Sequence, residues 1–119
     1  MANLQQLTSL DQWNAALEGT SSKPLLVFKH STSCSVSAGA QEETMRYIEN
    51  DRSGRVDYAI VHVIEDRPVS NEIADRLGVK HASPQAILVK DGEAVWNTSH
   101  WRITYDFLTE KLGASASGA

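Results

Sequence analysis

Cysteine is almost missing from this chain, because Cys34 is the only one among 119 residues. A single thiol excludes an intramolecular disulfide framework, so the composition does not indicate an oxidising compartment. No apolar stretch approaches the ~20 residues of a membrane span. The N-terminus also lacks a basic segment followed by an apolar run, which argues against a secretory signal. We therefore expect a cytoplasmic protein whose thiol stays reduced.

An excess of positive charge is missing as well. The net charge is −4, the pI is near 5.5, and the basic residues are scattered along the chain. This argues against nucleic acid or an anionic membrane as the main partner. The hydrophobic fraction of 41% and the charged fraction of 22% are ordinary for a globular protein. We expect one domain over residues 1–112 and a disordered small-residue tail over 113–119.

The pattern of apolar residues predicts alternating helices and strands. Expected are a helix capped by Ser9 and Gln12, a buried strand over 24–30, a helix from near Cys34, a strand over 56–63, a helix over 70–77 ended by Gly78, a hairpin around Asp91-Gly92 and a helix over 103–112. The order strand, helix, strand implies parallel pairing through a crossover, and the hairpin adds antiparallel strands. The sequence thus predicts an α/β fold with a mixed four-stranded sheet and helices on both faces.

Cys34 stands where the buried strand gives way to a helix. At a helix start it would face unpaired amide N–H groups and the positive end of the helix dipole. Both favour the thiolate and lower a thiol pKa from ~8.5 toward ~7 or below. Lys29 and His30, just upstream, add positive potential. A buried, inert cysteine is the alternative, but the surrounding serines and threonine make a poor wall for an apolar pocket.

Ser37 stands where a Cys-x-x-Cys enzyme carries its second cysteine. It lies one helical turn after Cys34, so its hydroxyl is placed to hydrogen-bond a thiolate there. An ordinary residue at the start of the helix is an equally good interpretation of Ser37. In either case it cannot resolve a mixed disulfide, so a thiol from outside the chain must release any disulfide formed at Cys34.

Taken together, these features resemble the thioredoxin superfamily over about residues 9 to 112. The strand-to-helix cysteine of "FKHSTSCSVS" is followed some fifty residues later by Gly-Val-Lys-x-x-x-Pro and a strand-Asp-Gly-strand hairpin. The resemblance implies that Pro84 is cis and lies beside the cysteine. It also implies that Ser83 offers backbone hydrogen bonds to an extended substrate.

Three separate blocks, "FKHSTSCSVS", "RPVSNEIADRLGVKHASPQ" and "GEAVWNTSHWRIT", are similar to the monothiol bacilliredoxin family. That resemblance implies a thiol–disulfide oxidoreductase that removes bacillithiol from mixed disulfides on oxidised cytoplasmic proteins. Bacillithiol would be a co-substrate, with no tightly bound cofactor, and Thr32 and Ser33 would contact substrate beside Cys34. Ser33 and Ser35 depart from the usual threonine and proline, and the second change leaves an amide N–H in the first helical turn.

A second group of residues is expected to hold the low-molecular-weight thiol. Ser99, His100 and Trp101 precede the final helix, at the corner where related thiol-transfer folds bind such thiols. His81, in the proline loop, would tune charge or contact carboxylates of the ligand. A zinc site built from Cys34 and the histidines lacks any close Cys or His pairing, so we expect no metal.

Two other functions stay open from the sequence. The first is a monothiol glutaredoxin-like carrier of glutathione or an iron–sulfur cluster, although the Cys-Gly-Phe-Ser motif of such carriers is replaced here by Cys34-Ser35-Val36-Ser37. The second is a redox-silent adaptor with the same fold. The pH dependence of Cys34 alkylation separates an activated thiol from an ordinary one.

Overall fold

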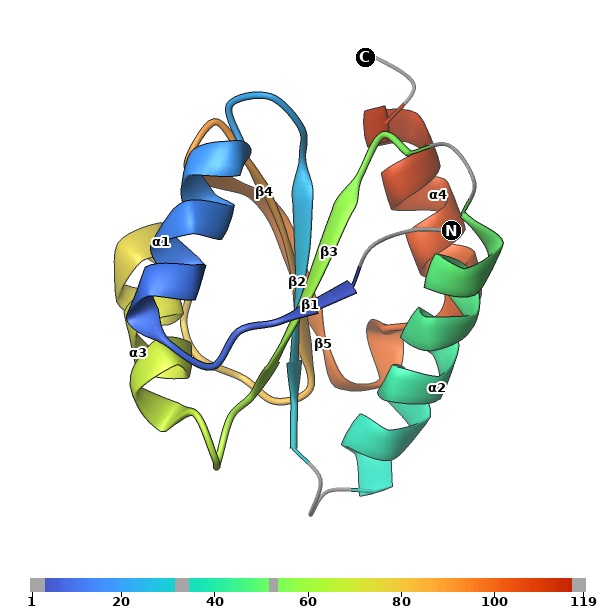
Figure 1. Ribbon diagram of the computed structural model, residues 1–119. Helices are drawn as coiled ribbons and strands as arrows, with labels where there is room; N and C mark the ends of the chain where they lie inside the picture. Colours follow the sequence, from blue (N-terminus) through green and yellow to red (C-terminus); the bar gives the residue numbers. More distant parts are fainter. Residues whose placement is uncertain (1–3, 32–34, 52–53, 117–119) are drawn as a thin grey trace.

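A computed structural model describes residues 4–31, 35–51 and 54–116, with backbone alone for 35–37 and 113–116 (Figure 1). Its elements in chain order are β1 (Leu4–Gln6), α1 (Leu10–Gly19), β2 (Leu25–His30), α2 (Ser35–Asn50), β3 (Asp57–His62), α3 (Arg67–Leu77), β4 (Gln85–Lys90), β5 (Glu93–Ser99), the short 3₁₀ helix η1 (His100–Arg102) and α4 (Tyr105–Ala116). Within the described residues, no helix has the length and apolarity needed to cross a membrane.

The strands form one mixed sheet in the order β1-β3-β2-β4-β5. β1, β3 and β2 are parallel, whereas β4 is antiparallel to both β2 and β5. The predicted α/β class, the parallel β2–β3 pair and the late hairpin are confirmed. The sheet has five strands rather than the expected four, because β1 was not predicted. Its three exposed residues carry no strand pattern of their own, and pairing with β3 gives them their conformation.

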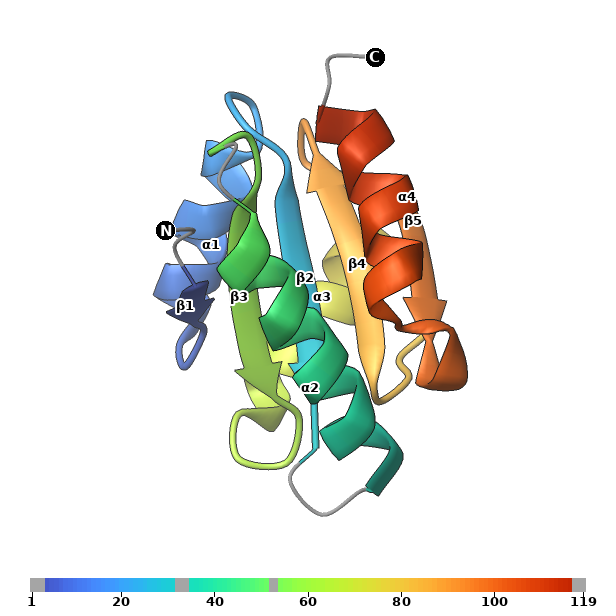
Figure 2. The same cartoon turned by 90° about the vertical axis from the view of Figure 1, so that its right-hand side faces the viewer.

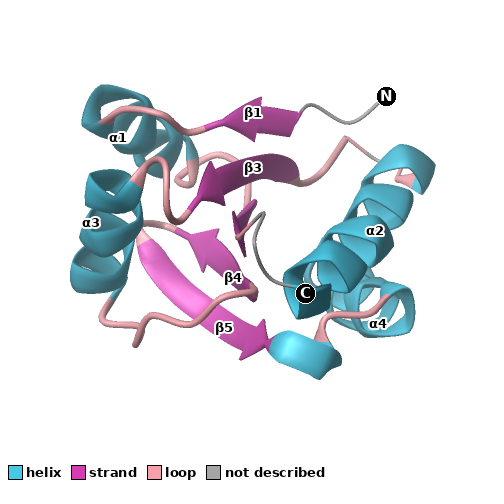
Figure 3. Cartoon of the chain, turned by 90° about the horizontal axis from the view of Figure 1, so that it is seen from below, coloured by secondary structure: helices cyan, strands magenta, loops and turns pink. Residues whose placement is uncertain are grey.

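Two pairs of helices cover opposite faces of the sheet, α1 and α3 on one face and α2 and α4 on the other (Figures 2 and 3). Successive residues of β2 point to alternate faces. Leu26 and Phe28 pack in the core beneath α2 and α4, and Leu25 and Val27 pack in the core beneath α1 and α3. The next residue of the second series is Lys29, so a charged side chain continues an apolar row.

Local signals set most of the boundaries. The Ser9 side chain accepts a hydrogen bond from the backbone N–H of Gln12 and caps α1 as expected. Gly78 ends α3 in the left-handed conformation, with φ of 66°. Asp91 and Gly92 both have positive φ, as a two-residue hairpin turn of this type requires.

Two helix boundaries differ from the prediction. α3 begins at Arg67, three residues before the expected start at 70, because Pro68 fits the first helical turn, where an N–H is not needed. α4 continues to Ala116, so residues 113–116 are helical rather than a disordered tail. Alanine favours helix without needing burial, which explains how a small-residue segment extends it. Residues 117–119 lie outside the described residues.

Candidate functional site

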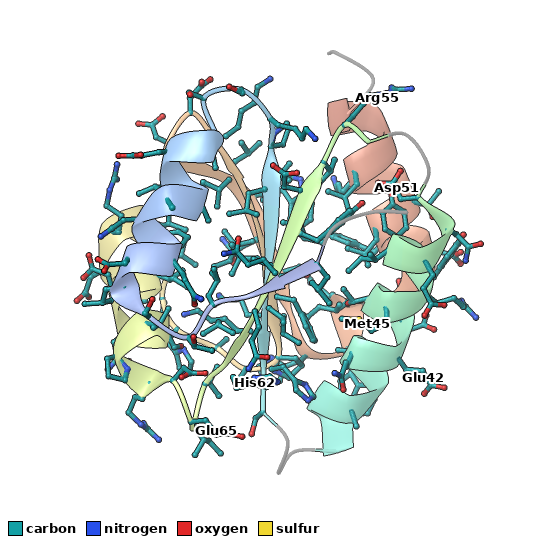
Figure 4. The ribbon with its side chains drawn as sticks, viewed as in Figure 1. Glu42, Met45, Asp51, Arg55, His62 and Glu65 are labelled. Carbon is teal, nitrogen blue, oxygen red and sulfur yellow. The ribbon has the colours of Figure 1, made fainter. Side chains whose placement is uncertain are left out.

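One edge of the sheet gathers the segments that the sequence singled out. The parallel strands β2 and β3 end there at His30 and His62, which are partners in the register. β4 begins at the same edge with Gln85, which pairs with Lys29 on one side and with Ser99, the end of β5, on the other. In Figure 4, His62 lies toward the end of the molecule where α2 begins.

Cys34 itself falls outside the described residues, as do Thr32 and Ser33, and the side chain of Ser37 is not described either. Their assigned roles therefore stay predictions. The described residues show which elements lie on either side of the cysteine segment. β2 ends at His30, and α2 begins at Ser35, the residue after the cysteine. The predicted strand-to-helix setting of Cys34 is thus present on both sides of it.

Pro84 follows a cis peptide bond from Ser83, as the resemblance implied. The Pro84 carbonyl oxygen accepts a hydrogen bond from the backbone N–H of His100, at 3.1 Å. The Ser83 hydroxyl is buried and has no hydrogen-bond partner among the described residues. The proline loop and the segment that begins η1, two separate predictions from the sequence, therefore adjoin each other.

His30 is buried on the α2 and α4 face of the sheet. Its ring stacks on Phe28 and meets His62 edge to face, each at 5.8 Å between ring centroids. His62 is in turn hydrogen-bonded through Nδ1 to the side-chain amide of Gln6, at 3.0 Å. Because an amide N–H can only donate, Nδ1 of His62 accepts. These contacts give His62 a packing role at this end of the sheet.

Lys29 points to the opposite face, toward α3, and is fully buried. Its ammonium donates to the backbone oxygen of Ser70 at 3.1 Å and lies 3.3 Å from Nδ1 of His81. Burial disfavours the charged form and lowers the pKa of Lys29 to about 8. The pKa of His81 is lowered too, first by desolvation and then by the positive charges of Lys29 and Arg67.

Ser99, His100 and Trp101 line one open hollow of about 420 Å³ together with Asn97, Thr98 and Arg102. Trp101 is 78% exposed, which is unusual for a large aromatic side chain in a small domain. Trp96, by contrast, packs edge to face on Phe107 with ring centroids 5.5 Å apart. Trp96 is therefore a packing residue, whereas Trp101 is exposed.

Sequence reasoning missed Ser70 and Gln85 as parts of this region. Ser70 binds the buried ammonium, and Gln85 donates through Nε2 to the backbone oxygen of Lys80, at 3.0 Å, and so secures the proline loop. The available signal was Lys29 itself, because a charged residue inside a continuous apolar strand requires buried partners. Among the described residues, no cluster of three His, Cys, Asp or Glu side chains is arranged to hold a metal ion.

Residues 5–108 match the sequence profile of a family described as "Monothiol bacilliredoxin BrxC". A solved structure described as a proposed oxidoreductase with a thioredoxin fold is 34% identical, with a TM-score of 0.77 over 96% of this chain and 93% of the other.

Two thioredoxins show the same fold at lower identity. The protein from Fasciola hepatica is 15% identical, with a TM-score of 0.74 over 92% of this chain and 97% of its own. A mutant of a poplar thioredoxin h is 19% identical, with a TM-score of 0.78 over 99% of this chain and 86% of its own. The thioredoxin-like architecture expected from the order of elements is therefore confirmed.

Proposed function

The chain belongs to the monothiol bacilliredoxin family, and we propose that it removes bacillithiol from mixed disulfides on oxidised proteins, with Cys34 as nucleophile. The profile match over residues 5–108 carries this proposal, because it spans both the cysteine segment and the proline loop. The thioredoxin-like fold and the 34% identical oxidoreductase support the broader class, a thiol–disulfide oxidoreductase.

The reaction has two thiol–disulfide exchanges. The Cys34 thiolate attacks the bacillithiol sulfur of the mixed disulfide, a new S–S bond forms to Cys34, and the substrate protein leaves as its thiolate. A second bacillithiol thiolate then attacks the bacillithiol sulfur that is bonded to Cys34. Cys34 leaves as its thiolate, and the product is bacillithiol disulfide. External bacillithiol is therefore the reductant, and no second cysteine of this chain takes part.

The residues that flank Cys34 support an ionised sulfur. α2 begins at Ser35, and the first amide N–H groups of a helix have no partner within it. A thiolate just before that turn would accept from them and be favoured by the helix dipole. The hydroxyl of Ser37 and the positive potential of Lys29 and His30 would act in the same direction.

Two neighbouring segments would hold the substrate. Ser83 and Pro84 would bind the extended chain of the mixed disulfide through backbone groups, beside Thr32 and Ser33. The hollow at residues 97–102 would take the low-molecular-weight thiol, with Ser99, His100 and Trp101 in contact with it. The hydrogen bond from His100 to Pro84 supports a shared binding surface, because it joins these two segments.

Mass spectrometry tests the proposal directly. The protein is incubated with a bacillithiolated test protein, and the adducts on both are measured over time, in parallel with a Cys34→Ser variant. We expect one bacillithiol adduct on Cys34 and loss of the adduct from the substrate, neither of which occurs with the variant. Equal clearance by the two proteins contradicts the mechanism.

A parallel arm with a glutathionylated substrate identifies the thiol that is used. Bacillithiol removal at least ten times faster than glutathione removal supports the bacilliredoxin assignment, and the reverse preference supports the glutaredoxin-like alternative. Both exchanges require a reduced thiol, so we further propose that the protein works in a reducing compartment such as the cytoplasm.

A further inference from the structure

The Lys29 ammonium lies in the protein interior, where a charge is poorly solvated, and its hydrogen bonds explain how it is tolerated. It is fully enclosed between the sheet and α3, and its described hydrogen bonds are to the backbone oxygen of Ser70 and to Nδ1 of His81. An isolated buried charge is costly, so these acceptors are required for the ammonium to remain in place. Of the two acceptors, His81 is the one whose own protonation the contact affects.

The contact determines which nitrogen of His81 carries the proton. An ammonium group has three donors and no acceptor, so a ring nitrogen that it approaches must be unprotonated. Nδ1 of His81 lies 3.3 Å from Nζ of Lys29, and the Ser70 hydroxyl lies 3.5 Å from the same nitrogen and can donate to it. In the neutral ring the proton must then reside on Nε2.

The surroundings also keep the ring neutral. Partial desolvation, first, and then the positive charges of Lys29 and Arg67 lower the pKa of His81. Two further charged residues, Asp75 and Lys80, line the hollow of about 640 Å³ that His81 borders. These two are opposite in sign, and the groups that shift the pKa of His81 are instead the nearer cations Lys29 and Arg67, after desolvation.

His81 is exposed and stands three residues before cis-Pro84. Nδ1 faces the buried ammonium, so Nε2, on the other side of the ring, faces outward. The loop that carries it is secured where Gln85 donates to the Lys80 backbone oxygen. Pre-positioned donors of this kind bind a partner at a lower entropic cost than mobile ones.

We propose that Lys29 is a positioning residue that fixes His81 as the neutral Nε2–H tautomer, and that this N–H donates to an acceptor oxygen of the mixed disulfide. The inference rests on the proposed function and names a donor that recognises its substrate. The oxygen belongs either to a peptide carbonyl of the substrate protein or to a carboxylate of the low-molecular-weight thiol.

The first experiment needs no substrate. The ring ¹⁵N shifts of His81 are measured by NMR between pH 5 and 9 in the wild type and in Lys29→Met, which keeps the buried aliphatic stem. We expect the Nε2–H form in the wild type at pH 7, and in the variant a higher His81 pKa and a mixture of tautomers. A protonated or Nδ1–H ring in the wild type at pH 7, or identical spectra in the two proteins, overturns the proposal.

The second experiment compares two substitutions of His81. In His81→Gln the amide N–H₂ replaces the outward Nε2–H, whereas in His81→Asn the side chain reaches only as far as Nδ1. Loss of one hydrogen bond typically costs a few-fold to about tenfold in affinity. We expect KM to rise by about that factor in the Asn variant, to stay within about twofold in the Gln variant, and kcat to change little in either. Equal KM values for the two variants overturn the donor role.

The choice of substrate distinguishes the source of the oxygen. A rise in KM confined to bacillithiolated peptides, and absent with a small bacillithiol mixed disulfide that lacks a peptide, assigns the oxygen to a peptide carbonyl. A rise with both assigns it to the thiol. If the wild type takes no adduct on Cys34, the proposed function fails while the NMR result still decides the role of Lys29.

Discussion

The backbone N–H of His100 is hydrogen-bonded to the carbonyl oxygen of Pro84, at 3.1 Å. This bond joins the residue before β4 to the residue after β5, so it extends the β4–β5 hairpin beyond the pair Gln85–Ser99. His100 also has a φ of 57°, in the left-handed region that most side chains avoid. The two candidate binding segments are thus connected at His100, whose backbone has a left-handed conformation.

The backbone of His100 gives the first prediction. A β-branched residue is strained in the left-handed region, whereas asparagine is tolerated there. We expect His100→Val to be less stable than His100→Asn by about 1–2 kcal/mol. Urea denaturation of the two variants measures the difference. Equal midpoints and slopes would show that the segment relaxes without cost.

The second prediction concerns pH and Lys29. Its pKa is about 8 in the folded protein against 10.5 for an ordinary lysine. Between these values the unfolded chain binds more protons, so the stability of the wild type rises with pH, and the full penalty is present below pH 8. We expect the stability advantage of Lys29→Met over the wild type to shrink by about 3 kcal/mol between pH 8 and 10.5.

Denaturant unfolding at a series of pH values measures this change, and Lys80→Met serves as the control because Lys80 is exposed. The control should follow the wild type in parallel across that range. A gap between Lys29→Met and the wild type that stays constant from pH 8 to 10.5 would mean that the Lys29 pKa is not lowered.

The third prediction concerns the two tryptophans. Trp101 is exposed at the hollow proposed for the thiol, so Trp101→Ala should change the free energy of unfolding by less than about 0.5 kcal/mol. It should raise the KM for bacillithiol several-fold. Trp96→Ala removes the contact with Phe107 and should cost about 2–4 kcal/mol. Unfolding and steady-state kinetics of both variants test the assignment, which is wrong if Trp101→Ala leaves KM unchanged.

The fourth prediction concerns the opposite end of the molecule, where Asp51 and Arg55 lie (Figure 4). The buried Tyr58 hydroxyl donates to the Asp51 carboxylate, and burial together with that bond raises the pKa of Tyr58. Hydrogen bonds to charged groups contribute about 1.5–3 kcal/mol. A double-mutant cycle of Tyr58→Phe and Asp51→Ala should give a coupling energy near that range. Additive effects would show that the two groups act independently.

Much of the fold could be predicted because its signals are local. The boundaries of β2 and β3 lie within one residue of the expected ones, and the hairpin was set by Asp91-Gly92. β1 could not be predicted, because Leu4–Gln6 is extended through its partner strand and not through its own pattern. The expected start of α3 was three residues late, because the apolar pattern gives no sign of a first turn that a proline can occupy.

The candidate site was predictable in part. The cis state of Pro84 follows from the family resemblance and is present. The hydrogen bond between His100 and Pro84 was not predicted. The contact between Lys29 and His81 joins residues 52 apart in the sequence, and no local pattern gives such a contact. It depends on the packing of α3 against the sheet, which fixes the backbone oxygen of Ser70 where the ammonium reaches it.

The short strand β1 has a consequence for the chain in concentrated solution. Leu4–Gln6 occupies the outer hydrogen-bonding row of β3, which would otherwise offer a second molecule an open template for strand addition. Removal of the first six residues should therefore make the protein self-associate through the exposed edge of β3. Light scattering of the shortened protein over a concentration series would reveal such oligomers, and a concentration-independent monomer mass would show that β3 needs no cover.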